Sequence, residues 1–249
     1  MAEAAGTKGK LTLLTASTPN GVKISCALEV LGLDYEVKFV NIGQDDQFKP
    51  EFLAASPNNK IVSDFTSRST PLTLASLHPQ NVQPAIVDWR QADEPPQTVF
   101  ESGAILTYLA RKEGKLMPKD PREWIACMEW LFFQVGGFGP IPGQLHHFYG
   151  LPEDNTGRPY GIERFSKEVH RQYGVMDKRL QKTGAYFAGP NLSIADIAIF
   201  GWAWRHPRHR VSLDDYPAMK RWYKGLLARP EFQRGIAVPT KEQMQQARL

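Results

Sequence analysis

The spacing of apolar residues changes from one segment to the next at the start of the chain. Leu11–Leu14 is a short apolar run, and Tyr35–Val40 alternates apolar with polar residues, so each segment predicts a strand. Between them, Val22–Leu31 carries its apolar residues on one helical face, and Gly32 follows as a natural helix stop. A strand, a helix and a second strand in this order predict a parallel pair with a right-handed crossover.

A second group of elements follows after a long gap. Pro84–Trp89 and Thr98–Phe100 predict two strands, and the polar, proline-rich segment 90–97 between them predicts a hairpin loop. Glu101–Gly103 then opens a helix that we expect over Ala104–Lys112. The first half of the chain is thus predicted to be a mixed sheet with helices, in the order βαβ and then ββα.

The pattern becomes entirely helical beyond the linker Gly114–Asp120, whose glycine and proline mark the change. The predicted helices cover Glu123–Tyr149, Tyr160–Lys182, Ser193–Arg205 and Pro217–Ala228, with a short turn after Pro230. Within the first of these helices, the glycines and prolines of Gly136–Gly143 predict a kink. The expected organisation is a disordered tail at 1–10, an α/β domain at 11–113, an all-helical domain at 121–236 and a tail at 237–249.

The start of the helix after Leu192 has its own signature. Ser193 suits the N-cap, and Asp196 can reach back to the backbone N–H of the cap, which makes a capping box. Leu192 and Ile197 occupy the positions of a hydrophobic staple. We expect a structural role for this segment, with a loss of about 0.5–2 kcal/mol when Asp196 is replaced by alanine.

Composition limits the location and the partners. The 249 residues are 42% hydrophobic with a net charge of +4, and no apolar run approaches the ~20 residues that a membrane-spanning helix needs. Residues 1–10 have no apolar core, so we expect no signal peptide and no membrane partner. Cys26 and Cys127 show no metal-ligand spacing, and we expect a reducing, cytoplasmic location.

Two further clusters have spacings that do not favour a binding role. The basic cluster Arg205–Arg210 follows Trp202 and Trp204, but these tryptophans have helical spacing. We therefore expect packed rings and a solvated basic loop, not a nucleic-acid surface. His146 and His147 are adjacent and would point ~100° apart on a helix, so we expect helix-surface or interface residues and no metal site.

Several longer strings resemble one protein family. They are Thr18–Gly21, Phe48–Leu53, Ser56–Ile61, Phe100–Leu106, Trp130–Pro140 and Gln144–Phe148. Together with the order of elements and the capping box, they resemble the glutathione transferase superfamily, and within it the nu-class transferases and the related yeast nitrogen-regulator proteins. This resemblance covers residues 11–236. It implies a thioredoxin-like glutathione-binding domain, an all-helical second domain and a homodimer.

The activity that the resemblance implies is glutathione-dependent chemistry on thiols and disulfides, with glutathione as cosubstrate. In such proteins the glutathione sulfur lies at the loop that holds Thr18 and Asn20 here. A hydroxyl and an amide at a helix N-terminus can hydrogen-bond a thiolate, and the helix dipole favours the anion. The alternative is that both residues only cap the helix. Cys26 lies within the predicted helix, where we expect it to be packed rather than nucleophilic.

Other parts of the glutathione pocket are implied by the same resemblance. The turn at Glu101 and Ser102 would hold the γ-glutamyl end, because a helix N-terminus suits its carboxylate and Glu101 suits its ammonium. The remaining implied residues are Gln47, Lys60, the backbone of Ile61, the proline Pro84 and the helical-domain residue Arg164. For Arg164 the alternative is an exposed helix charge. The second substrate would lie against Trp130, Phe133 and Phe138.

The glutathione-cradling string is interrupted. Ser56–Ile61 would lead directly into Pro84–Trp89 in the resembling proteins, but Val62–Gln83 stands between them. The Ile–Pro bond, which is cis in that fold, is therefore missing. Either Lys60–Ile61 keeps its place in the pocket, or Val82–Gln83 takes that place and the Lys60 charge is lost. The sequence leaves both registers open.

The insert Val62–Gln83 is rich in serine and threonine and has no sustained period, which is unusual for a loop in a compact domain. Valine and glutamine codons can carry the first and last letters of an intron, so the insert could be a retained intron. A lid over the pocket and a harmless loop are the other readings. The protein is accordingly expected to be a glutathione-dependent enzyme, with a non-catalytic regulator or an inactive isoform as alternatives.

Overall fold

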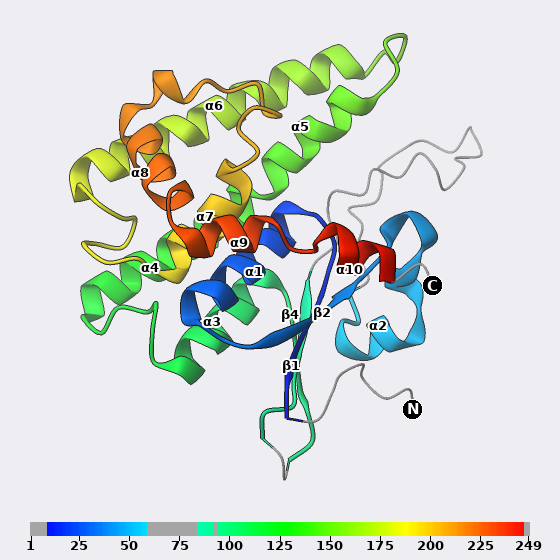
Figure 1. Ribbon diagram of the computed structural model, residues 1–249. Helices are drawn as coiled ribbons and strands as arrows, with labels where there is room; N and C mark the ends of the chain where they lie inside the picture. Colours follow the sequence, from blue (N-terminus) through cyan, green and yellow to red (C-terminus); the bar gives the residue numbers. More distant parts are fainter. Residues whose placement is uncertain (1–8, 59–83, 92–93, 247–249) are drawn as a thin grey trace.

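The computed structural model of the protein describes residues 9–58, 84–91 and 94–246. It contains a four-stranded sheet and a group of helices stacked beside it (Figure 1). The strands are β1 (Leu11–Thr15), β2 (Tyr35–Phe39), β3 (Ala85–Asp88) and β4 (Gln97–Phe100), in the order β2-β1-β3-β4. β1 and β2 are parallel, whereas β3 is antiparallel to both β1 and β4. The predicted βαβ–ββα half is therefore confirmed.

The two faces of the sheet bury different sets of side chains. Leu11, Leu13 and Ile86 belong to the core shared with α1 (Pro19–Leu31) and α3 (Ser102–Glu113). Leu14, Ala85 and Val87 form a smaller core with the short helix α2 (Pro50–Ala55) on the other face. This alternation follows from the period of two along a strand. Two short turns, η1 (Ile42–Gln44) and η2 (Asp46–Phe48), lead from β2 to α2.

Helix α1 begins at Pro19, three residues before the predicted start at Val22. Thr18 is its N-cap, and its hydroxyl oxygen accepts a hydrogen bond from the backbone N–H of Gly21 at 3.1 Å. Proline at the first helical position has no N–H to leave unsatisfied, so the turn Thr18–Gly21 becomes the first turn of the helix.

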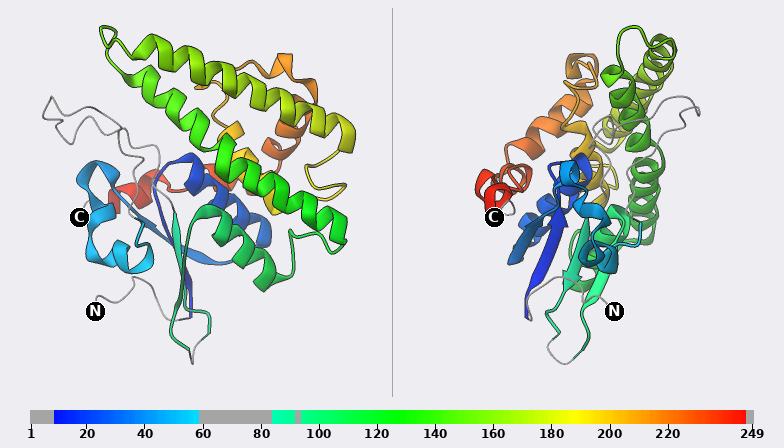
Figure 2. Two further views of the ribbon diagram at one scale, coloured as in Figure 1. Left: turned by 180° about the vertical axis from the view of Figure 1, so that it is seen from behind. Right: turned by 90° about the vertical axis from the view of Figure 1, so that its right-hand side faces the viewer.

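The second half of the described chain is helical. Its elements are α4 (Pro121–Phe133), η4 (Gln134–Phe138), α5 (Pro140–Gly150), α6 (Arg158–Thr183), α7 (Ile194–Ala203), η5 (Leu213–Asp215), α8 (Pro217–Leu227), α9 (Pro230–Ile236) and α10 (Lys241–Gln246). The predicted single helix Glu123–Tyr149 is interrupted at η4, which is a π-helical turn. The α5–α6 pair forms the part of the molecule farthest from the sheet (Figure 2). The expectation of a tail over 237–249 was wrong where α10 forms beside β2.

Helix α7 is buried along its whole length and joins the two halves. Its start is the predicted capping box, in which Asp196 accepts from the backbone N–H of Ser193 at 3.0 Å and from its hydroxyl at 2.7 Å. The same carboxylate also accepts from the backbone N–H of Phe187 and from the indole of Trp222. The structural role predicted for Asp196 is confirmed, and it extends beyond the cap to two further segments.

Some expectations about single side chains need correction. His146 does not lie on a helix surface: it is 2% exposed, and its ring lies 4.9 Å from that of His209. Adjacency to His147 in the sequence does not reveal this packing. Cys26 and Cys127 are free and buried. Within the described ranges, we find neither a helix able to span a membrane nor a cluster of three metal-ligating residues.

Candidate functional site

The N-terminus of α1 brings Thr18 and Asn20 to the junction between the sheet and the helices. Thr18 is 3% exposed and caps the helix, as the alternative reading of the sequence expected. Asn20 is 5% exposed, and its side-chain Oδ1 accepts a hydrogen bond from Trp202 Nε1 at 3.0 Å. The amide of Asn20 is thereby oriented by α7, so the helical domain fixes one wall of this site.

The N-terminus of α3 forms a second wall. Glu101 precedes the helix with φ of 69°, a backbone conformation that is strained for a residue with a side chain. Its carboxylate accepts a hydrogen bond from the Asn58 amide at 3.2 Å, which ties the end of Ser56–Asn58 to the start of α3. Ser102 is the first helical residue and is 2% exposed. The strained turn therefore presents one carboxylate and one hydroxyl at a helix start.

A buried lysine that was not among the predicted site residues connects these two walls. Lys23 on α1 is 2% exposed; its ammonium donates to Ser102 Oγ at 3.1 Å and to Gln134 Oε1 at 2.6 Å. Burial lowers the pKa of Lys23 to about 7, and the nearby Glu101 carboxylate opposes that shift in part. The signal in the sequence was a charged residue between the two apolar residues Val22 and Ile24.

Some of the other residues predicted for the glutathione pocket lie in the described part of the chain, and others do not. Gln47 in η2 is fully buried, and its Oε1 has no hydrogen-bond partner among the described residues. Pro84 is buried directly before β3, whose Ala85 pairs with Leu14. Lys60 and Ile61 lie outside the described residues, and so do the insert Val62–Gln83 and the choice between the two registers. Of these predicted residues of the glutathione pocket, Gln47 and Pro84 therefore lie within the described part of the chain.

Arg164 lies on the exposed face of α6. It lines a groove of about 600 Å³ between α5 and α6, together with Ile141 and Phe165. Its guanidinium is exposed, as the alternative reading expected, and its contact with glutathione stays a prediction.

The predicted aromatic pocket is divided between core and surface. Phe138 is fully buried and packs edge-on against Tyr173, with ring centroids 5.3 Å apart. It was wrong to expect Phe138 in a substrate pocket, because the π-helical turn η4 points its ring into the helical core. Trp130 and Phe133 are partly buried and pack on each other, and Trp130 also contacts Phe187. Their role toward a second substrate stays a prediction.

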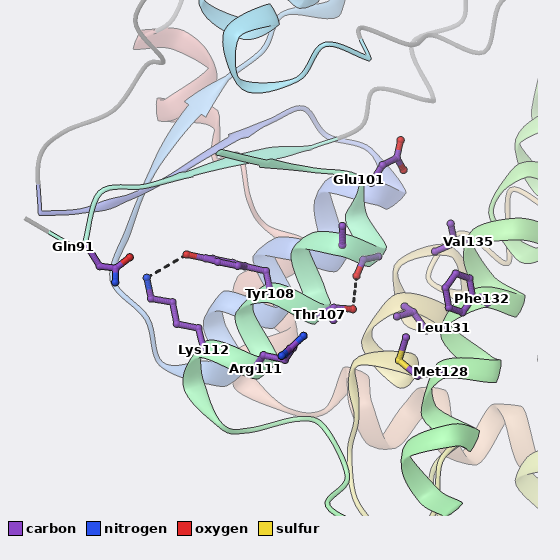
Figure 3. A pocket seen from close by; sticks show the side chains of 12 residues that line it. Gln91, Glu101, Thr107, Tyr108, Arg111, Lys112, Met128, Leu131, Phe132 and Val135 are labelled. Carbon is purple, nitrogen blue, oxygen red and sulfur yellow. Dashed lines mark hydrogen bonds between the residues drawn. The ribbon is translucent and has the colours of Figure 1, made fainter. Parts of the chain in front are cut away.

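A groove of about 910 Å³ runs between α3 and α4 (Figure 3). Apolar side chains line one side of it, namely Met128, Leu131 and Phe132 of α4 and Val135 of the following turn η4. Polar and charged side chains of α3 line the other side, including Tyr108, Arg111 and Lys112. Glu101 lies at one end, so this groove adjoins the turn that begins α3.

Known proteins match the chain in sequence and in structure. Residues 9–61 match the family model of the glutathione S-transferase N-terminal domain and residues 147–230 that of the C-terminal domain. The first match ends at Ile61, where the interruption begins. The Escherichia coli protein named disulfide-bond oxidoreductase YfcG is 43% identical, over 88% of this chain and 91% of that protein.

Solved structures give the same result. A glutathione transferase family member from Pseudomonas fluorescens with two glutathione bound aligns with a TM-score of 0.78 at 36% identity, over 94% of this chain and 96% of that one. Ure2p in complex with glutathione aligns with a TM-score of 0.77 at 25% identity, over 93% of this chain and 95% of that one. The chain belongs to the glutathione S-transferase family, in the branch that contains YfcG and Ure2p.

Proposed function

We propose that the protein is a glutathione-dependent enzyme that reduces disulfides or transfers glutathione to an electrophile, with glutathione as cosubstrate. The observation that carries this proposal is the direct link between the starts of α1 and α3, the 3.1 Å bond from Lys23 to Ser102. One helix start suits a thiolate and the other suits a carboxylate, so together they match the two ends of a γ-glutamyl-cysteinyl group. The name of the relative YfcG supports disulfide chemistry.

Thr18 and Asn20 are proposed to stabilise the glutathione thiolate at the start of α1. The thiolate would attack one sulfur of a disulfide substrate, form a mixed disulfide and release the other sulfur as a thiolate that takes a proton from water. A second glutathione would attack the glutathione sulfur of the mixed disulfide, giving glutathione disulfide and the reduced substrate. Substrate gains two electrons and two glutathiones lose them, so no protein thiol is needed.

The protein's own cysteines support this assignment. Burial, with a contribution from the Glu29 carboxylate, raises the pKa of the Cys26 thiol. Burial also raises the pKa of Cys127, although hydrogen bonds around Ser193 oppose the shift. A buried thiol with a raised pKa is a poor nucleophile. Two free, buried thiols also fit the cytoplasmic location that we propose.

Glutathione is proposed to lie with its γ-glutamyl end at Glu101 and Ser102. The hydroxyl and backbone N–H of Ser102 suit the carboxylate, and Glu101 suits the ammonium. Gln47, Pro84 and Arg164 are proposed to border the rest of the molecule, with Lys60 and Ile61 as expected from the sequence. The buried Gln47 Oε1 without a partner among the described residues favours a ligand on that side.

We also propose that two copies associate through the α3–α4 groove. On α4, Phe132 is 67% exposed, Ile125 50% and Trp124 41%. These residues share the helix face of Met128 and Val135, because they recur at spacings of three and four. Such an apolar face is typical of a covered interface.

Turnover of a small disulfide with excess glutathione tests the enzymatic proposal. We expect Thr18→Ala and Asn20→Ala to lower kcat/KM, each by about tenfold or more, through the loss of a hydrogen bond to a charged sulfur. The matched control, Cys26→Ala with Cys127→Ala, should keep the activity. Full activity in both site variants, or loss only in the cysteine variant, would contradict the proposed chemistry. Glutathione binding without turnover in the unaltered protein would favour a regulator instead.

A further inference from the structure

The buried ammonium of Lys23 is held by two neutral acceptors. Ser102 offers a hydroxyl oxygen and Gln134 an amide oxygen, and these two side chains are 2% and 0% exposed. A buried cation is normally compensated by a carboxylate, because desolvation disfavours the charge. Here the Glu101 carboxylate acts on Lys23 only through its field. The interior therefore holds a positive charge that an additional anion would stabilise.

Lys23 is enclosed by both halves of the molecule. α3 contributes Ser102, the π-helical turn η4 contributes Gln134, and α7 passes directly over the lysine stem at Gly201. A Cβ at Gly201 would lie 2.6 Å from Lys23 Cγ, so the close approach requires glycine. The groups of α3, η4 and α7 that contact Lys23 are Ser102, Gln134 and Gly201, and all three are neutral. Among the described residues, the charged group that acts on Lys23 is Glu101, which precedes α3.

The direction of the Lys23–Ser102 hydrogen bond decides what Ser102 can do. A lysine ammonium has three donors and no acceptor, so Ser102 Oγ must accept from it. The hydroxyl proton of Ser102 then has to point elsewhere and can be donated to a ligand. A neutral lysine amine could instead accept that proton, and Ser102 would then be lost as a donor.

We propose that Lys23 is a positioning residue for glutathione, whose ammonium holds the Ser102 hydroxyl as a donor to the γ-glutamyl carboxylate and supplies positive charge behind the start of α3. This inference rests on the proposed function, because it places that carboxylate at Ser102. It adds a residue on α1 that acts through Ser102. The affinity for glutathione then depends on whether the Lys23 amine is protonated.

The sign of the pH dependence follows from the lysine. Burial lowers the pKa of Lys23 to about 7 in the free protein, so part of the lysine is neutral at neutral pH. A bound carboxylate favours the ammonium and raises this pKa, so binding takes up a proton. Affinity should be full below about pH 6 and should fall as the pH rises through and above about 7, by at most tenfold per pH unit.

S-methylglutathione is the suitable probe, because it carries the γ-glutamyl group but no titrating thiol. Its affinity would be measured by calorimetry from about pH 6 to about pH 8, with the titration of its own amine measured separately and subtracted. For the unaltered protein we expect the fall described above. For Lys23→Met, which keeps the length of the side chain, we expect affinity weaker by roughly 10- to 100-fold at about pH 6 and little change with pH.

Three further variants separate positioning from a general effect. Lys38→Met removes the same charge from an exposed site on the edge strand β2 and should keep the affinity and pH profile of the unaltered protein. Ser102→Ala should weaken binding, and Lys23→Met with Ser102→Ala should lose little more than the worse single variant. Additive losses would overturn the claim that Lys23 acts through Ser102.

Proton uptake on binding to the unaltered protein tests the role of Lys23 even if the Lys23→Met variant does not fold. Binding heats at about pH 7 in buffers of different ionisation enthalpy should show a fraction of one proton taken up. Binding without proton uptake, or a Lys23→Met variant with unchanged affinity and profile, would overturn this inference and leave the glutathione site intact. No binding of the probe to the unaltered protein would refute the proposed function as well.

Discussion

Asp196 is the single residue with the clearest structural role. Its buried carboxylate accepts four hydrogen bonds, two from Ser193 and one each from Phe187 and Trp222. An alanine at this position would leave these donors buried without an acceptor. The loss therefore exceeds that of a helix cap alone.

We expect Asp196→Ala to lower the free energy of unfolding by about 2–4 kcal/mol, compared with about 0.5–2 kcal/mol for cap loss. Urea unfolding followed by circular dichroism measures this difference. Ser193→Ala is the matched control, because it removes the cap hydroxyl and leaves the bonds to Phe187 and Trp222, so its loss should be smaller. Equal losses in the two variants would show that the contacts outside the cap contribute nothing.

Individual side chains also show where sequence reasoning stops. Thr18 and Asp196 could be placed because capping depends on neighbours in the chain. Phe138 and His146 were misplaced because helical periodicity gives a face but not what packs against it. Lys23 was missed because its partners, Ser102 and Gln134, are far away in the sequence and meet only in the fold.

At the scale of elements, the order of strands and helices in the first half followed from periodicity and turn residues. The second half was less predictable at its interruptions. Glycines in Gln134–Phe138 indicated a break, but the turn there is π-helical, a rare conformation that the glycines alone do not distinguish from a kink. α10 was missed because it is short and polar, and it forms beside β2 from the other end of the chain.

The exposed apolar face of α4 supports a prediction about assembly. Phe132→Glu should convert the proposed homodimer to monomer, with a dimer dissociation constant at least about tenfold higher, because a charge would be buried in an apolar interface. Light scattering coupled to size-exclusion chromatography measures the mass. Tyr160→Glu on α6 is the control, since that ring is 68% exposed on another face. An unaltered protein that is monomeric, or a Phe132→Glu variant that stays dimeric, would contradict this interface.

At the scale of the whole molecule, the site lies where the two halves meet. Asn20 is held by Trp202 of α7, and Lys23 joins Ser102 of the sheet half to Gln134 of the helical half. Each half therefore contributes to the geometry of the other at the proposed glutathione site. The resemblance of the strings identified this fold family correctly, and three of the strings, Thr18–Gly21, Phe100–Leu106 and Trp130–Pro140, contribute residues to the junction. It did not reveal the interdomain hydrogen bonds.

The interruption after Ile61 makes the affinity for glutathione the most direct test. Calorimetry would compare the full chain with a variant that lacks Val62–Gln83, in which Ile61 again precedes Pro84. We predict that the full chain binds glutathione and that Ser102→Ala weakens this binding by about tenfold or more. If only the shortened variant binds, the insert abolishes the site and this chain is an inactive isoform. If neither binds, the proposed site at the starts of α1 and α3 is wrong.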